Sequence, residues 1–179
     1  MAYQTPEFHP AFEEYCETIF ELAEDDLEVI QARIAERMEV SRPAVSEMIK
    51  RLEAEGLVDM KGSAISLTGE GQQLAQAVVR RHRLAERFLT DVLQLSWAEA
   101  HHEAGKWEHV ISPVVEEALN LFLDTPTTCP HGNPIPGSDY QPPKSQALSE
   151  IVVGAPFTVS RITEELEFTD GMLEFLEES

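Results

Sequence analysis

Between residues 30 and 56 the sequence carries two short helical patterns joined by a tight turn, and few folds accommodate that order. Apolar residues recur every three or four positions from Ile30, which predicts a helix ending near Glu39. Ser41 is suited to cap a second helix with Pro43 in its first turn, and that pattern stops at Gly56. The spacing predicts two helices linked by only a few residues.

Two short β patterns follow directly. Apolar residues at 57–60 and 65–67 flank the turn Lys61-Gly62-Ser63, which predicts a small hairpin. A helix-turn-helix followed by a hairpin is typical of winged DNA-binding domains, whose second helix enters the major groove. We therefore predict a winged helix-turn-helix domain over residues 1–70, with a first helix at 7–24.

Capping residues and apolar spacing in the middle of the chain predict further helices, so we expect a mainly α fold. Thr68 can cap a long helix, Ser96 and Glu99 form a capping box, and Ser112 precedes a helix with an apolar stripe. Six of the eleven prolines then fall between 126 and 143. We assign residues 71–125 to a helical domain and 126–144 to a proline-rich linker.

Residues 145–179 predict a different structure. The runs at 151–153 and 157–159 indicate strands, and 172–176 a short helical turn. About 35 residues with one or two strands bury too little surface to fold alone. We therefore expect the beginning of a small β domain here, cut short.

The charge distribution is uneven. The net charge of −20 argues against nonspecific binding to polyanions or anionic membranes. Residues 31–87, however, carry ten Lys and Arg against eight Asp and Glu, whereas residues 1–30 carry nine acidic residues and no basic one. This favours one DNA-facing surface. Two cysteines and the lack of a long apolar run further predict a cytoplasmic protein without a membrane span.

Basic and polar residues on the second helix of the motif lie on faces away from its apolar stripe, as phosphate and base contacts require. Glu47 can accept a hydrogen bond from a cytosine amino group or can be neutral. The alternative for each residue alone is an ordinary solvated face. The candidate DNA-contacting residues are Ser41, Arg42, Pro43, Ser46, Glu47, Lys50, Arg51 and Lys61.

Metal-ligand chemistry is indicated on two consecutive predicted helices. His82 and Glu86 are four residues apart and share a helix face. His101, Glu108 and His109 share a face of the next helix, where Gly105 offers only its carbonyl. A core histidine or an ion pair explains any one of these residues, but two such faces together favour a metal site.

Further candidate ligands lie outside these two helices. Glu14 and Glu17 on the first helix are placed to reach the cluster, and Cys16 points elsewhere and is expected to pack inside. Cys129 and His131 fall in the proline-rich loop, and we do not include them among the ligands.

With these features placed, residues 13–138 resemble the diphtheria-toxin-repressor family of metal-dependent transcription regulators. The resemblance is carried by 82–86 (HRLAE), 107–109 (WEH) and 132–137 (GNPIPG). It implies a winged-helix domain, a helical dimerisation domain, a homodimer on double-stranded operator DNA, and two neighbouring sites for Fe(II) or Mn(II). Residues 145–179 resemble the start of the SH3-like domain that many members carry.

By position, the resemblance assigns His82, Glu86 and His101 to an ancillary site, and residues 14, 105, 108 and 109 to a primary site. Glu14 and Gly105 replace the methionine and cysteine of the iron-responsive branch. The manganese branch has carboxylates at 14, 17 and 105, so the match fails at 105. Without the two sulfur donors the site favours a harder cation, which predicts Mn(II) with Fe(II) a close second.

The leading interpretation is a non-enzymatic, homodimeric repressor of metal-homeostasis genes with a metal corepressor. One alternative is a winged-helix regulator of an organic ligand, with a merely structural acidic cluster. Another is a metallohydrolase, which the absence of a His-Glu-x-x-His motif disfavours.

Overall fold

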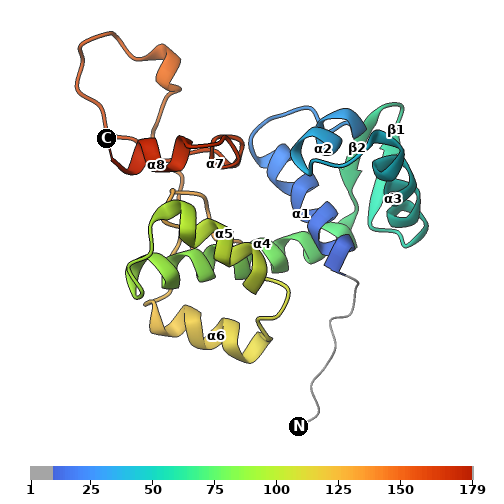
Figure 1. Ribbon diagram of the computed structural model, residues 1–179, viewed down its shortest axis with the longest axis horizontal. Helices are drawn as coiled ribbons and strands as arrows, with labels where there is room; N and C mark the ends of the chain where they lie inside the picture. Colours follow the sequence, from blue (N-terminus) through green and yellow to red (C-terminus); the bar gives the residue numbers. More distant parts are fainter. Residues whose placement is uncertain (1–9, 179) are drawn as a thin grey trace.

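The computed structural model describes residues 10–178, which are mostly helical, as predicted (Figure 1). The sequence of elements is α1 (Pro10–Glu24), α2 (Gln31–Arg37), α3 (Arg42–Ala54), β1 (Val58–Lys61), β2 (Ala64–Leu67), α4 (Gly69–Asp91), α5 (Trp97–Trp107), α6 (Pro113–Phe122), the 3₁₀ turn η1 (Leu148–Glu150), α7 (Glu164–Glu167) and α8 (Met172–Glu177). Among the described helices, none has the combination of length and hydrophobicity needed to cross a membrane.

The helix-turn-helix and its wing form as predicted. The turn between α2 and α3 contains Glu39 in the left-handed region, with φ of 53°. Ser41 caps α3, because its hydroxyl accepts a hydrogen bond from the Ala44 amide. Strands β1 and β2 are antiparallel and leave a two-residue loop that begins with Gly62 at φ of 66°.

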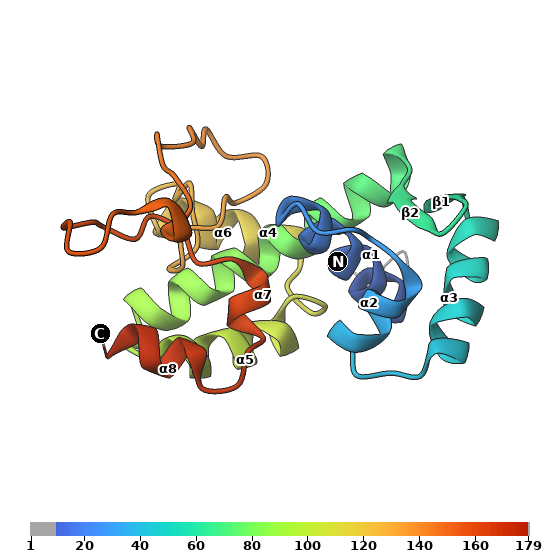
Figure 2. The same cartoon turned by 90° about the horizontal axis from the view of Figure 1, so that it is seen from above.

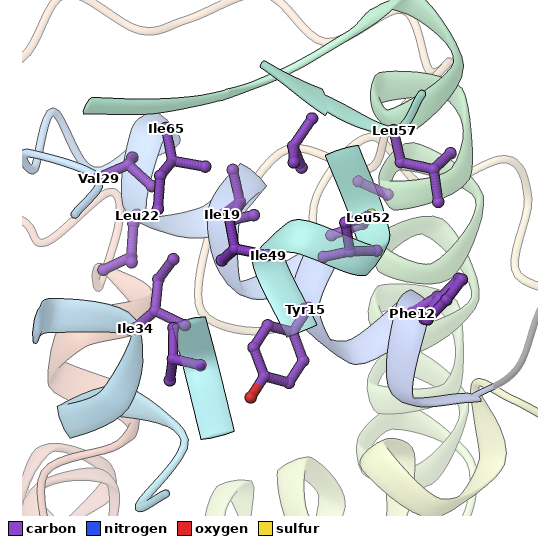
Figure 3. Packing of buried hydrophobic residues seen from close by; sticks show 14 of the residues in the cluster. Phe12, Tyr15, Ile19, Leu22, Val29, Ile34, Ile49, Leu52, Leu57 and Ile65 are labelled. Atoms are coloured by element: carbon purple, nitrogen blue, oxygen red, sulfur yellow. The ribbon is translucent and has the colours of Figure 1, made fainter. Parts of the chain in front are cut away.

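Helix α1 supplies one side of the core of the predicted DNA-binding unit, which runs from α1 to β2, residues 10–67 (Figure 3). Its apolar face packs against α2, α3 and the hairpin, and Cys16 is fully buried there, as expected. The labelled core side chains are Phe12, Tyr15, Ile19, Leu22, Val29, Ile34, Ile49, Leu52, Leu57 and Ile65. The position of α1 is thereby fixed relative to α3.

Helix α4 connects the DNA-binding unit with the other helices (Figure 2). Thr68 caps it through the Gly71 amide. Gly71 is required at this junction, because a Cβ there would lie 1.9 Å from the Leu57 carbonyl oxygen. The second half of α4 packs against α5 through a small core that includes Ala85 and Leu89.

The strands predicted for 151–153 and 157–159 are wrong. The described structure has no strand at these residues, and Val152 and Val153 are exposed. A β-branched run becomes a strand only when another strand supplies a hydrogen-bonding ladder, and here Gly154 turns the chain at φ of 87°. The helical turn predicted at 172–176 is confirmed by α8, and the SH3-like assignment stays a prediction.

Candidate metal centre and DNA-reading surface

His82 and Glu86 share one face of α4, as their spacing predicted, and they face His101 on α5, as the family resemblance implied. His101 Nδ1 is 3.0 Å and His82 Nε2 is 3.2 Å from Glu86 Oε1. The two imidazole nitrogens are 3.3 Å apart, and His82 and Glu86 are buried. Two nitrogens and a carboxylate oxygen converging on one point can hold a divalent cation.

A second donor group combines three elements. Glu17 on α1 joins His82 on α4 and Glu108 at the end of α5, and one ligand atom from each lies within 4.8 Å of the others. His82 Nδ1 is 2.6 Å from Glu108 Oε2. Glu17 Oε1 is buried without a hydrogen-bond partner in the described structure. His82 thus belongs to two groups, through a different nitrogen in each.

A third group was missed at the sequence level. Cys129 and His131 in the proline-rich linker lie beside Glu86, again with ligand atoms within 4.8 Å of one another. The His131 side chain is fully buried, and its Nε2 makes no hydrogen bond within residues 10–178. The only available signal was the Cys-x-His spacing next to the family-like 132–137 run, and its loop position counted against it.

The C-terminal segment adds a carboxylate to this third group. Glu167 Oε2 forms ion pairs with His131 Nδ1 at 2.8 Å and with His101 Nδ1 at 3.3 Å. The Ile162 amide donates to the His131 carbonyl at 2.8 Å, which ties the two segments together. No pattern in the sequence places Glu167 next to α4.

Glu14, Glu108 and His109 also come together, in a looser arrangement. His109 Nε2 is 3.2 Å from Glu108 Oε1 and 3.7 Å from Glu14 Oε1, and the Glu14 side chain is 51% exposed. Gly105 adds no side-chain donor, and a Cβ built there would meet nothing within 4 Å beyond its own helix backbone. The buried Glu13, which the sequence analysis overlooked, lies 2.6 Å from His109 Nδ1 and leaves Nε2 facing the other two carboxylates. Its position four residues before Glu17 was the available signal.

Burial and neighbouring charges set the protonation of the cluster. Burial acts to lower the pKa of His82, but Glu86 and Glu108 outweigh it and raise that pKa well above its usual range. Burial acts to raise the pKa of Glu86, but the nearby histidines hold it well below its usual range. The pKa of Glu17 is raised by burial and by the charges of Glu108 and Glu21.

The donor set therefore fits a divalent metal. Glu17 Oε1 and His131 Nε2 are buried without a hydrogen-bond partner among the described residues, which is costly unless an ion satisfies them. A cation would also offset the repulsion among the buried carboxylates. Histidine and carboxylate donors suit first-row metals, and Cys129 adds one softer donor.

The candidate DNA-contacting residues lie on the outer face of α3 and at the wing tip. All are exposed except Ser46, which is partly buried. Ser41 has a structural role as the cap of α3, and the Arg51 guanidinium lies 5.1 Å from the Phe12 ring centre. In Figure 2, α3 runs along the side of the molecule far from α5 and α8.

Two family models match this chain. The iron dependent repressor N-terminal DNA binding domain matches residues 7–64, and the iron dependent repressor metal binding and dimerisation domain matches residues 68–137. The "Iron-dependent repressor IdeR" of Mycobacterium leprae is 50% identical over 126 residues, covering 70% of this chain and 55% of the relative. The "Diphtheria toxin repressor" of Corynebacterium diphtheriae is 47% identical over 128 residues, covering 71% and 57%.

Solved structures agree with these matches. A "Manganese-dependent transcriptional repressor complex with manganese" has a TM-score of 0.67 at 39% identity and covers 75% of this chain and 62% of its own. The "manganese regulator SloR" has a TM-score of 0.63 at 45% identity, covering 71% and 60%. This chain spans just over half the length of the two curated relatives. With the winged helix, the metal-donor cluster and both domain models in agreement, the chain belongs to the iron-dependent repressor family.

Proposed function

We propose that this protein is a cytoplasmic, metal-dependent transcriptional repressor that binds operator DNA as a homodimer when Mn(II) or Fe(II) occupies its donor groups. It would control genes of metal homeostasis. The observation that carries the proposal is the placement of Glu14 and Glu17 on α1, which is packed into the DNA-binding unit. Glu17 is grouped with His82 of α4 and Glu108, and Glu14 faces His109 just after α5. A metal held there would fix the DNA-binding unit relative to the other helices.

Exposed apolar side chains on α6 and just before it support the homodimer. Val110, Val114, Leu121 and Phe122 are each more than 60% exposed. A contiguous apolar surface of this kind is typical of an interface. Pairing two copies there would present two α3 helices to DNA, whose half-sites lie about 34 Å apart in such complexes.

The donor chemistry supports both candidate metals. Glu17, His82 and Glu108 offer only oxygen and nitrogen, which favours Mn(II), whereas the Cys129 thiol beside Glu86 favours a softer ion such as Fe(II). We assign Mn(II) as the first candidate and Fe(II) as the second. Titrating each ion anaerobically into the protein on a DNA-binding assay ranks them.

The test starts from DNA selected by the wild-type protein from a random duplex pool in MnCl₂, and this duplex serves as the operator probe. Binding should require metal and disappear with EDTA.

Arg42→Ala and Lys50→Ala should weaken probe binding without changing metal affinity. Where the lost contact is to a phosphate, the slope of log affinity against log salt concentration should become shallower by about one unit. His109→Ala should abolish the metal response. Binding of the probe that is unaffected by EDTA would contradict the proposal and favour an organic effector.

A further inference from the structure

The segment 161–168, which contains α7 and is called here the bridging segment, runs between α5 and the DNA-binding unit (Figures 1 and 2). Near α5 it lies beside the metal-donor cluster, the three groups formed by Glu17, His82, Glu86, His101, Glu108, Cys129 and His131. It contacts the cluster and the DNA-binding unit through different side chains. On the cluster side, Glu167 lies beside His131 and His101. Glu164 Oε1 accepts a hydrogen bond from Arg83 Nη2 at 2.7 Å. This side is buried, since Glu164 and Glu167 are 2% and 7% exposed.

On the DNA-binding side, the segment is attached to the last residue of α2. The Arg37 side chain is 5% exposed, and its Nη1 donates to Glu165 Oε2 at 3.1 Å. Its guanidinium carbon lies 3.7 Å from the centre of the Phe168 ring, a cation–π contact. Asp25, just after α1, accepts from the Glu165 amide and from Arg161 Nη2.

Phe168 touches both sides directly. Its ring meets the His101 ring edge to face at a centroid distance of 5.2 Å, while Arg37 lies over it. Helix α2 packs against α3, and only residues 38–41 separate Arg37 from the first residue of α3. The path from a candidate metal ligand to the DNA-reading helix therefore passes through two side chains, Phe168 and Arg37.

We infer that Arg37 and Phe168 are positioning residues that transmit metal occupancy to the DNA-reading helix through the bridging segment. The inference rests on the proposed function and extends it. The buried carboxylates of Glu86 and Glu167 both lie close to His101 Nδ1, at 3.0 Å and 3.3 Å, so a cation bound there holds the segment in place and its loss favours release. With the segment docked, Arg37 fixes α2 and hence the angle at which α3 meets DNA.

The test measures coupling, defined as the ratio of probe affinity in saturating Mn(II) to that in EDTA. The variants are Arg37→Gln, Phe168→Leu and Glu165→Gln, and Arg33→Gln is the matched control. Arg33 is on the same helix and loses the same charge, but its described hydrogen bond goes to the Glu28 carbonyl rather than to the bridging segment. Mn(II) affinity without DNA is measured by competition with a chelator, and hydrogen exchange follows the amides of 161–168.

We expect coupling to fall at least fivefold in Arg37→Gln and Phe168→Leu and by a smaller factor in Glu165→Gln, and to stay unchanged in Arg33→Gln. Mn(II) affinity without DNA should stay within twofold of wild type. Added Mn(II) should protect 161–168 from exchange in the wild type and less in Arg37→Gln. If Arg37→Gln does not fold, Phe168→Leu still tests the inference. Because Phe168 is half-exposed, we expect that variant to fold.

The two failures are distinguishable. A wild-type protein that binds the probe equally in Mn(II) and in EDTA overturns the proposed function. A wild-type protein that requires Mn(II), together with unchanged coupling in both Arg37→Gln and Phe168→Leu, overturns only the inference about the bridging segment.

Discussion

At the scale of single residues, Glu14 is the candidate ligand on α1 that faces His109, just after α5. Its carboxylate is the exposed member of the group with Glu108 and His109. Replacing it by methionine exchanges a hard oxygen for a soft sulfur donor. We expect Glu14→Met to shift the metal response from Mn(II) toward Fe(II) in anaerobic titrations on the operator probe, with Glu28→Met as a surface control. An unchanged ranking of the two metals would remove Glu14 from the sensor.

Glu21 gives a stability prediction with a defined pH dependence. Burial, reinforced by Glu164, raises its pKa from 4.5 to about 8, although Arg37 opposes the shift. Between these values the folded protein binds more protons than the unfolded chain, so this residue's contribution to stability falls as pH rises from about 4.5 to about 8. Glu21→Gln keeps an acceptor for Arg37 and removes the charge.

We therefore expect the melting temperature of Glu21→Gln to exceed that of wild type by a few degrees at pH 8.5 and to match it near pH 4.5. Differential scanning fluorimetry at both pH values, without metal, measures this. The exposed Glu36→Gln serves as control. A difference that grows toward low pH would contradict the assignment.

Sequence spacing identified some of the residues at the centre and not others. His82 and Glu86 were found because a four-residue interval on a helix fixes a shared face without reference to the rest of the fold. Glu167 was not, because its neighbour His101 is far away along the chain and only tertiary packing brings them together. His131 was passed over because a loop carries no periodicity from which to place a side chain.

At the scale of elements, helix starts were predictable because capping is local. Ser41, Ser96 and Ser112 each cap the helix expected from them. The strands expected at 151–159 failed for the opposite reason, since a strand depends on a partner that the sequence of the segment does not specify. Packing between elements likewise depends on single positions such as Gly71, where no local pattern in the sequence predicts the close contact with Leu57.

Gly71→Ala should destabilise the junction of the wing and α4. The new methyl would overlap the Leu57 carbonyl, which accepts a hydrogen bond from the Thr68 amide. We expect a loss of about 1–3 kcal/mol in the free energy of unfolding, measured in urea. Gly69→Ala on the same first turn, where a Cβ meets nothing within 4 Å, should not destabilise. Equal stabilities for the two variants would contradict the close contact at the wing.

At the scale of the whole molecule, the apolar face of α6 predicts the assembly state. Val114 is 79% exposed, so a charge there leaves the protomer folded. We expect Val114→Glu to convert a dimer into a monomer by light scattering, and to weaken probe binding in Mn(II) because one half-site is lost. Glu117→Gln on the same helix is the control. A wild-type protein that is monomeric at micromolar concentration with Mn(II) would contradict this prediction.

The double use of His82 makes metal loading a matter of competition. One of its nitrogens faces Glu108 and the other faces Glu86 and His101. A neutral imidazole has a single lone pair to give, since its other nitrogen carries a proton. A metal ion bound to His82 in one donor group therefore leaves the other group without this ligand, unless the ring also loses its remaining N–H proton. We therefore expect the stoichiometry and affinity of metal binding at the two groups to be linked, because one ligand is shared between them.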